Sequence, residues 1–98
     1  MSDLENKGKI YNLSDDFVLY RGNSQEERFF LFNIKNGKIY RLNKVSYSML
    51  ELFDGTLGTE DIFNLLSKHF NVERNHLKAD LYRMIDEWTG RNILIERG

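Results

Sequence analysis

Hydrophobic residues in the first half of the chain recur in short runs that are typical of β-strands. The run 17–20 is rich in strand-forming residues, and the run 29–34 contains three phenylalanines and two aliphatic residues. Asn36 and Gly37 follow, and both residue types accept the positive φ angles of a tight hairpin turn. The pattern therefore predicts a short strand over 17–20 and an antiparallel hairpin formed by 29–34 and 38–42.

After this hairpin the hydrophobic period changes from two to about 3.6, which indicates that the second half is helical. Asn43 is a candidate N-cap for a first helix that Gly55 ends, and Thr59 is a candidate N-cap for a second helix. A third helix is expected to begin near Glu73 and to end at Gly90. The apolar stripes of these helices are Val45, Met49, Leu52 and Phe53, then Ile62, Leu65, Leu66 and Phe70, and finally Leu77, Leu81, Met84, Ile85 and Trp88.

The order of these elements predicts an α+β fold that is winged-helix-like: a three-stranded antiparallel N-terminal sheet is followed by three helices. Residues 1–13 begin with a polar stretch, so we expect a flexible or loosely docked N-terminal segment and a folded domain over 14–98. The apolar residues 93–95 predict a short strand or a tail that folds back. No further strand is expected between the hairpin and these residues.

The strand 38–42 is expected to lie at an edge of the sheet, because no strand-forming segment follows it directly. An edge strand carries unpaired N–H and C=O groups, which a protein must protect or can use to bind an extended peptide. Two interpretations stay open at this point: residues 10–13 or 93–95 could cover the strand, or the strand could accept a peptide. Both faces of the predicted sheet are apolar, which requires a second cover or leaves an exposed binding surface.

Composition and charge narrow the class of protein. The 98 residues carry a formal net charge of −1, with 41% hydrophobic and 30% charged residues, as expected for a single soluble domain. The lack of cysteine excludes disulfides, thiolate metal sites and cysteine nucleophiles, and it fits a cytoplasmic protein. Neither a signal peptide nor a membrane-spanning segment is expected.

No catalytic or metal-binding pattern is apparent in the sequence. His69 and His76 belong to different predicted helices, and there is no HExxH motif, glycine-rich phosphate loop or Ser/His/Asp grouping. The acidic pairs at 15–16 and 26–27 lack the alternating ligand spacing of a calcium loop. We therefore expect a protein that is not an enzyme and that needs no cofactor or metal.

Two other functions have to be weighed against peptide binding. Three helices after a sheet resemble winged-helix nucleic-acid-binding regulators, but residues 73–91 carry four acids and four bases. Binding to phosphates needs an excess of lysine and arginine, so nucleic acid is not an expected partner. The other alternative is a homodimerisation module that uses the same sheet edge.

Six segments, in this order and at fitting intervals, carry a resemblance to a known family: 37–43, 52–56, 59–62, 70–72, 77–81 and 90–95. They resemble the family of the pyrroloquinoline quinone biosynthesis protein D. Its members are also called recognition elements for ribosomally synthesised, post-translationally modified peptides (PqqD-like, or RiPP recognition elements). The resemblance covers residues 17–96. Asn92 stands where the family often has glycine, and asparagine tolerates the positive φ angle that this turn needs.

The resemblance implies that the leader segment of a precursor peptide adds as a strand to 38–42. The leader would lie in the cleft between this strand and the third helix, and a separate modifying enzyme or leader peptidase would then act on the peptide. By analogy, a lasso-peptide system is favoured. The implied peptide-binding residues are Lys38, Ile39, Tyr40, Arg41, Leu42, Leu77, Asp80, Leu81, Arg83 and Met84.

Apolar side chains of the leader are expected to enter a groove lined by Ile39, Leu77, Leu81 and Met84. A charged residue at Leu81 or Met84 is therefore expected to weaken leader binding and to leave the domain folded.

Charged residues beside this groove are expected to adjust the charge complementarity with the leader. They are Lys38, Arg41, Asp80 and Arg83. Asp80 borders the apolar stripe of the third helix, where its carboxylate could orient a polar or cationic group. Alternatively, Asp80 is a solvated residue or pairs with Lys78, Arg83 or Arg41.

Overall fold

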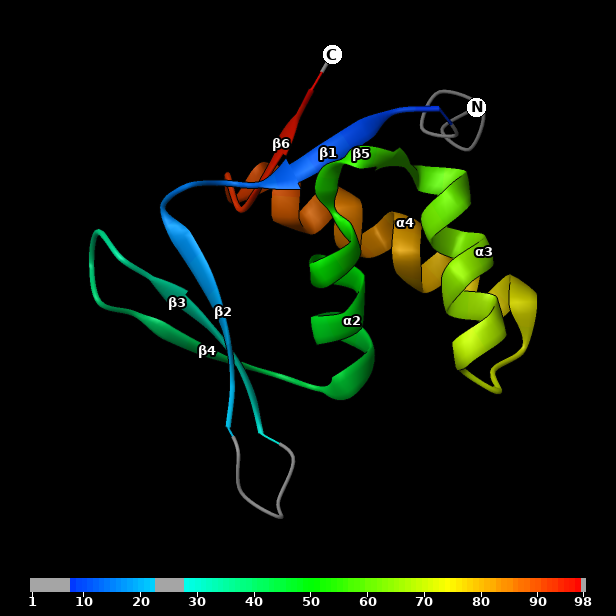
Figure 1. Ribbon diagram of the computed structural model, residues 1–98, viewed down its shortest axis with the longest axis horizontal. Helices are drawn as coiled ribbons and strands as arrows, with labels where there is room; N and C mark the ends of the chain where they lie inside the picture. The colour runs from blue at the N-terminus through cyan, green and yellow to red at the C-terminus, as the bar shows by residue number, and fades with distance from the viewer. Residues whose placement is uncertain (1–7, 23–27, 98) are drawn as a thin grey trace.

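Two three-stranded antiparallel sheets and three helices make up residues 8–22 and 28–97, which are the residues that the computed structural model describes. The elements follow in the order β1 (Ile10–Leu13), β2 (Phe17–Arg21), β3 (Phe29–Asn33), β4 (Ile39–Leu42), α2 (Lys44–Leu52), β5 (Asp54–Gly58), α3 (Thr59–His69), α4 (Arg74–Gly90) and β6 (Leu94–Glu96). The sheets have the strand orders β2-β3-β4 and β5-β1-β6 (Figure 1). The predicted α+β class, with an N-terminal sheet and three helices, is confirmed.

The predicted hairpin is formed by β3 and β4, with a longer connection than a two-residue turn. The Asn33 side-chain oxygen accepts hydrogen bonds from the N–H groups of Lys35 at 2.9 Å and Asn36 at 3.3 Å. The Asn36 side chain in turn accepts one from the N–H of Lys38 at 2.9 Å. These side chains replace the missing backbone partners of the loop, and Gly37 supplies its positive φ of 75°. Residues 34 and 38 belong to this loop, so β3 and β4 are each one residue shorter than predicted.

The start of α2 agrees with the prediction, whereas the start of α3 does not. Asn43 caps α2, since its side-chain oxygen accepts a hydrogen bond from the N–H of Ser46 at 2.8 Å. For α3 the N-cap is Gly58, and Thr59 is the first helical residue. The Thr59 hydroxyl is fully buried and donates to the carbonyl of Lys9 at 3.1 Å, so it joins α3 to the segment before β1.

The helix α4 begins and ends where the sequence predicts. The Glu73 carboxylate is its N-cap and accepts from the N–H groups of Asn75 at 3.1 Å and His76 at 2.9 Å. The helix ends at Gly90, and Asn92 has a φ of 61°, the positive value expected for the following turn.

The strand β5 was not predicted, because its sequence, DGTLG, contains residue types that disfavour strands. It forms because β1 pairs with it, with Ile10 opposite Gly58 and Asn12 opposite Asp54. Gly55 has a φ of 88°, and a Cβ at this position would lie 3.4 Å from the Cβ of Asn12. Glycine therefore serves both the backbone conformation and the close approach of the two strands.

Residues 10–13 belong to the folded domain. Tyr11 in β1 is only 4% exposed, and its ring makes an edge-on contact with Phe53 at 6.0 Å between centroids. The same strand pairs with β6, which confirms a short C-terminal strand. The domain therefore begins before the predicted boundary at residue 14, and residues 1–7 of the predicted flexible segment lie outside the described residues.

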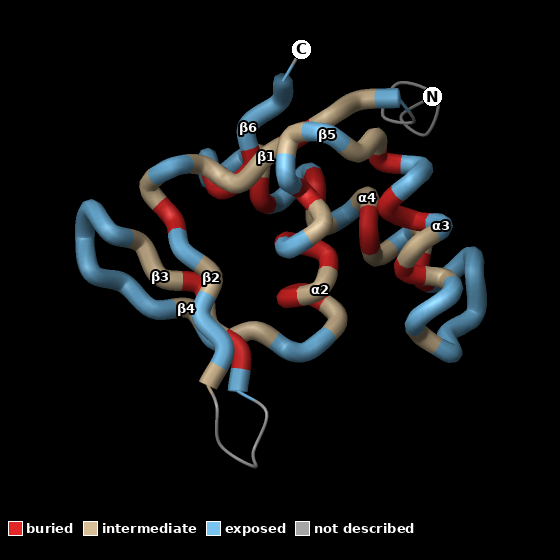
Figure 2. Tube along the Cα trace, viewed as in Figure 1, coloured by how far each residue is buried: buried red, intermediate tan, exposed pale blue. Residues whose placement is uncertain are grey.

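The hydrophobic core is built from all three helices and from both sheets, and Figure 2 shows buried stretches on each of them. The apolar stripe of α4 faces into this core. Its buried residues are Leu77, Leu81, Ile85 and Trp88. None of the helices in the described residues is both long and apolar enough to cross a membrane.

Candidate peptide-binding site

The strand β4 is an open edge of its sheet. Among the described residues, only β3 pairs with it. The two segments that could have covered it, β1 and β6, pair with each other in the second sheet. Figure 1 shows that second sheet at the top of the view, away from β4 at the lower left. The prediction of an edge strand is therefore confirmed for Ile39–Leu42.

The main-chain groups of Ile39 and Arg41 point to the open side of this edge. The N–H of Asn33 donates to the carbonyl of Lys38 at 2.8 Å, so these two residues form a hydrogen-bonded pair between the strands. Hydrogen-bonded and non-hydrogen-bonded pairs alternate along an antiparallel ladder. The next residue of β4 that bonds to β3 is therefore Tyr40, and the N–H and C=O groups of Ile39 and Arg41 face away from β3.

The side chains of β4 alternate between the two faces of the sheet. Tyr40 and Leu42 lie on the inner face, where they are half-buried against the core. Ile39 and Arg41 lie on the outer face, and Ile39 is 64% exposed. The prediction that Ile39 lines a groove toward the third helix is therefore wrong, and Tyr40 and Leu42 occupy that side of β4.

On α4, only part of the predicted set is accessible. Leu77 is 1% exposed and Leu81 is 0% exposed, so neither side chain can contact a peptide unless the core opens. The prediction that they line a groove is wrong, because their stripe fills the core of this small domain. Met84 is half-buried, and its sulfur accepts a hydrogen bond from the Ser46 hydroxyl at 3.6 Å. Met84 therefore lies beside the first turn of α2, which directly follows β4.

The predicted charged residues fall into two groups. On α4, the Asp80 carboxylate contacts the guanidinium of Arg83 at 2.9 Å and the imidazole of His76 at 3.6 Å, so its ion-pair partners come from its own helix. Lys38 and Arg41 are exposed, and neither forms an ion pair with any residue in the described ranges. The open edge therefore carries two positive charges without a counter-ion from the described part of the chain.

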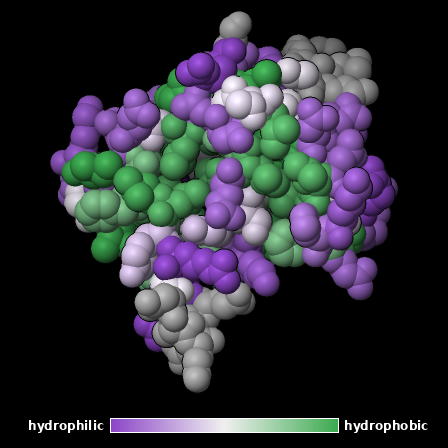
Figure 3. Space-filling view, in the orientation of Figure 1, coloured by the Kyte–Doolittle hydropathy of each residue, from purple (hydrophilic) through white to green (hydrophobic). Residues whose placement is uncertain are grey.

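The outer face of the β2-β3-β4 sheet is apolar and exposed. A shallow hollow of about 330 Å³ on this face is lined by Val18, Tyr20, Phe30, Phe32 and Ile39. Tyr20 is 59% exposed, and its ring lies 6.2 Å from that of Phe30. Figure 3 shows apolar residues, in green, over this sheet on the left of the view, and the green continues across the middle of the molecule. The prediction that both faces of the sheet are apolar is confirmed.

Beneath β3, the ring of Tyr47 in α2 packs against Phe29 at 4.8 Å between centroids. Burial raises the pKa of the Tyr47 phenol, and the nearby carboxylate of Glu51 raises it further. The contact between Tyr47 and Phe29 joins the inner face of the sheet to α2.

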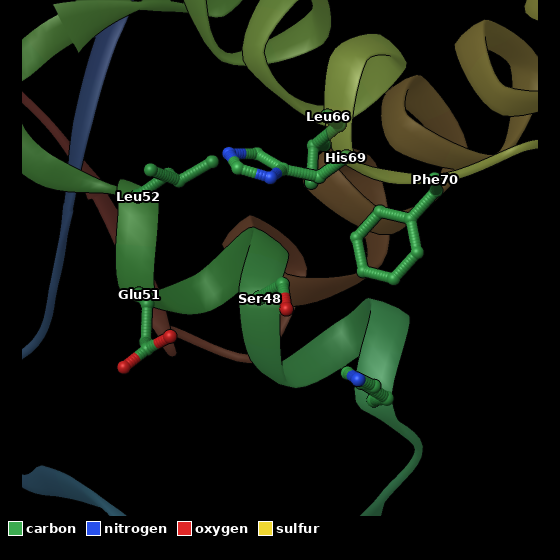
Figure 4. A pocket seen from close by; sticks show the side chains of 7 residues that line it. Ser48, Glu51, Leu52, Leu66, His69 and Phe70 are labelled. Atoms are coloured by element: carbon green, nitrogen blue, oxygen red, sulfur yellow. The ribbon is translucent and has the colours of Figure 1, made fainter.

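A second hollow of about 530 Å³ lies between α2 and α3 (Figure 4). It is lined by Lys44, Ser48, Glu51, Leu52, Leu66, His69 and Phe70. Figure 4 shows the Ser48 hydroxyl and the Glu51 carboxylate pointing away from the His69 imidazole, so these three side chains form no catalytic relay. Within the described ranges, no group of three or more histidine or acidic residues could hold a metal ion.

Comparisons with known proteins agree with this geometry. Residues 28–94 match the family model described as coenzyme PQQ synthesis protein D (PqqD), and no curated protein shows a significant match. One solved structure with the same fold is described as TbiB1 in complex with the TbiA(beta) leader peptide. It is 18% identical, with a TM-score of 0.69 over 85% of this chain and 93% of that one. Another is described as lasso peptide synthetase B1 complexed with the leader peptide. It is 13% identical, with a TM-score of 0.69 over 87% of this chain and 96% of that one.

At these identities the two solved structures establish the shared fold. The family match concerns the candidate site directly. The matched residues include β3, the open edge β4 and all three helices. The match spans well over half of the chain and confirms the resemblance carried by the sequence segments. This chain belongs to the PqqD family.

Proposed function

We propose that this chain binds the leader segment of a ribosomally synthesised precursor peptide by β-strand addition to β4. The observation that carries the proposal is the open edge, where no strand within 8–22 or 28–97 pairs with the free side of Ile39 and Arg41. Two solved structures with this fold are described as complexes with leader peptides, which supports a peptide ligand. One of them is described as lasso peptide synthetase B1, so a lasso-peptide system is the favoured setting.

Backbone pairing alone does not account for tight binding. Ile39 and Arg41 each offer one donor and one acceptor, and a hydrogen bond contributes about 0.5–1.5 kcal/mol net. Ordering a disordered leader costs about 2–5 kcal/mol, which offsets this gain. A micromolar complex needs about −8 kcal/mol. Side-chain contacts must supply the rest, and on the inner side of the edge they would come from Tyr40, Leu42 and Met84.

The chain would act by binding, without catalysis, and would deliver the leader to a separate modifying or processing enzyme. A strand that adds at the edge lies in the plane of the sheet, so the outer apolar face stays accessible while the peptide is bound. A second protein could therefore contact the loaded domain there. Precursor peptides are made on ribosomes, and the cytoplasm is accordingly the proposed location.

The test is calorimetry with the leader of a precursor peptide from the same gene cluster. Wild type is expected to bind it with micromolar or tighter affinity, and Met84→Asp to bind about tenfold or more weakly, since a carboxylate replaces an apolar contact. Ala79→Asp introduces the same charge at an exposed position of α4 and is expected to bind like wild type. Urea unfolding shows whether Met84→Asp is folded, and Met84→Ala replaces it if it is not.

Wild-type protein that fails to bind this leader would contradict the proposed function. Full affinity in the folded Met84 variants would remove Met84 from the site and leave strand addition in place. A homodimer through the same edge would compete with the peptide for Ile39 and Arg41. Light scattering with and without the leader separates the two, because a dimer of this kind dissociates as the peptide binds.

A further inference from the structure

We propose that the bound peptide is also selected on the outer face of the sheet. The peptide carries an apolar residue opposite Ile39 and, two positions away, an acidic residue opposite Arg41. This inference rests on the proposed strand addition at β4, and it specifies the residue pattern of the ligand at that site.

Two cross-strand rows run across the outer face and end at the open edge. Directly opposite residues of antiparallel strands share a face, so the register of the sheet defines both rows. The first row is entirely apolar and consists of Val18, Phe32 and Ile39. The second row ends in a guanidinium and consists of Tyr20, Phe30 and Arg41.

The end of the apolar row is incompletely covered. Ile39 has Phe32 as its cross-strand neighbour on one side, while its other side faces the open edge, and the side chain is 64% exposed. Side chains directly opposite each other in a sheet lie about 4.5–5.5 Å apart at Cβ. An apolar peptide residue opposite Ile39 would therefore cover this exposed flank, and a polar residue would leave it in water.

The end of the second row carries an unneutralised charge. Arg41 is exposed and forms no ion pair with a residue in 8–22 or 28–97. Opposite charges that face each other across two strands stabilise the pairing, and like charges destabilise it. A basic residue on an edge can also serve only to prevent aggregation. That role predicts no preference for acidic residues in a bound peptide, so the two explanations differ in a measurable way.

The spacing of the two preferences follows from the ladder. Ile39 and Arg41 both present their main chain to the open edge and their side chains to the outer face. Their peptide partners are therefore also two residues apart, and the residue between them points to the inner face. An antiparallel peptide would read acidic-x-apolar from its N-terminus, and a parallel peptide would read apolar-x-acidic.

A displayed library of random peptides of about 15 residues is a suitable probe, because an extended segment is the ligand that an open sheet edge accepts. It is selected against the full chain, and the clones kept are those that lose binding to Arg41→Pro, which blocks the main chain of the edge. Wild type is expected to enrich an acidic residue two positions from an apolar one. Arg41→Glu is expected to enrich lysine or arginine at the acidic position, and Ile39→Thr to lose the apolar preference.

Lys38→Glu is the matched control, because it makes the same charge change at the residue just before β4, where the alternation of the strand places it on the opposite face. It is expected to keep the acidic preference opposite Arg41. A peptide selected on wild type should bind Arg41→Glu about fivefold or more weakly, and an acid-to-lysine exchange in that peptide should restore binding.

Clones with no acidic bias, or with the same bias for wild type and Arg41→Glu, would overturn the outer-face inference and leave strand addition intact. Two other results would contradict strand addition at β4. One is that the clones bind wild type and Arg41→Pro equally well, and the other is that no clones are enriched. The two failures are therefore distinguishable.

Discussion

Leu81→Asp is expected to unfold the domain. Leu81 is 0% exposed in the centre of α4, so the exchange removes core packing worth about 2–5 kcal/mol. The carboxylate also has to be buried without a partner or neutralised, which costs several kcal/mol more. A domain of this size has a free energy of unfolding of about 5–15 kcal/mol. Far-UV circular dichroism and a urea titration are expected to show a largely unfolded protein.

Ala79→Asp is the matched control for this experiment, because it adds the same residue to an exposed position of the same helix. Its free energy of unfolding is expected to change by no more than about 1 kcal/mol. A Leu81→Asp protein with a native spectrum and a wild-type urea midpoint would contradict the placement of Leu81 in the core. It would then favour the groove-lining role that the sequence suggested.

Arg41→Pro is expected to abolish most of the peptide affinity while the domain stays folded. Proline removes the N–H of residue 41, which faces the open edge and is not used by the β3–β4 ladder. The bound peptide loses a hydrogen bond and meets the proline ring, so calorimetry should show binding about tenfold or more weaker. Tyr40→Pro, one residue away, removes a ladder hydrogen bond and is expected to destabilise the domain itself.

Arg41→Ala separates the main chain from the side chain, since it keeps the N–H and removes the guanidinium. It is expected to bind the leader more tightly than Arg41→Pro does. Equal affinities for these two folded variants would mean that the peptide does not use the N–H of residue 41. An unaltered stability of Tyr40→Pro would reverse the assignment of bonded and open residues along β4.

Local patterns in the sequence were sufficient to predict the hairpin, the helix order and the cap at Asn43. Each depends on residues close together in the chain, such as the Asn43 side chain and the N–H of Ser46. The strand β5 depends instead on pairing with β1, more than forty residues earlier. Three of the five residues of Asp54–Gly58 are aspartate or glycine, which disfavour strands, so this element and the second sheet could not be predicted locally.

The open edge could be predicted from the order of the elements. The prediction of which side chains lie beside it was only partly correct. From the apolar stripe of α4, Leu77, Leu81 and Met84 were assigned to a peptide groove. A small domain uses such a stripe for its core, which is where Leu77 and Leu81 lie. Ile39 was placed on the wrong face. Strand alternation contained the missing signal, because Tyr40 and Leu42 share one face and exclude Ile39 from it.

Residue-resolved amide hydrogen exchange on β4, with and without saturating leader peptide, examines the open edge itself. In the free protein the amides of Ile39 and Arg41 are expected to exchange rapidly, while that of Tyr40 is protected by the ladder with β3. Saturation with the leader is expected to slow the amide exchange of Ile39 and Arg41 by about tenfold or more, so that the alternation between these residues and Tyr40 becomes weaker. Amides of Ile39 and Arg41 that are already protected in the free monomer, or that stay fast when the leader is fully bound, would contradict peptide binding by strand addition at this edge.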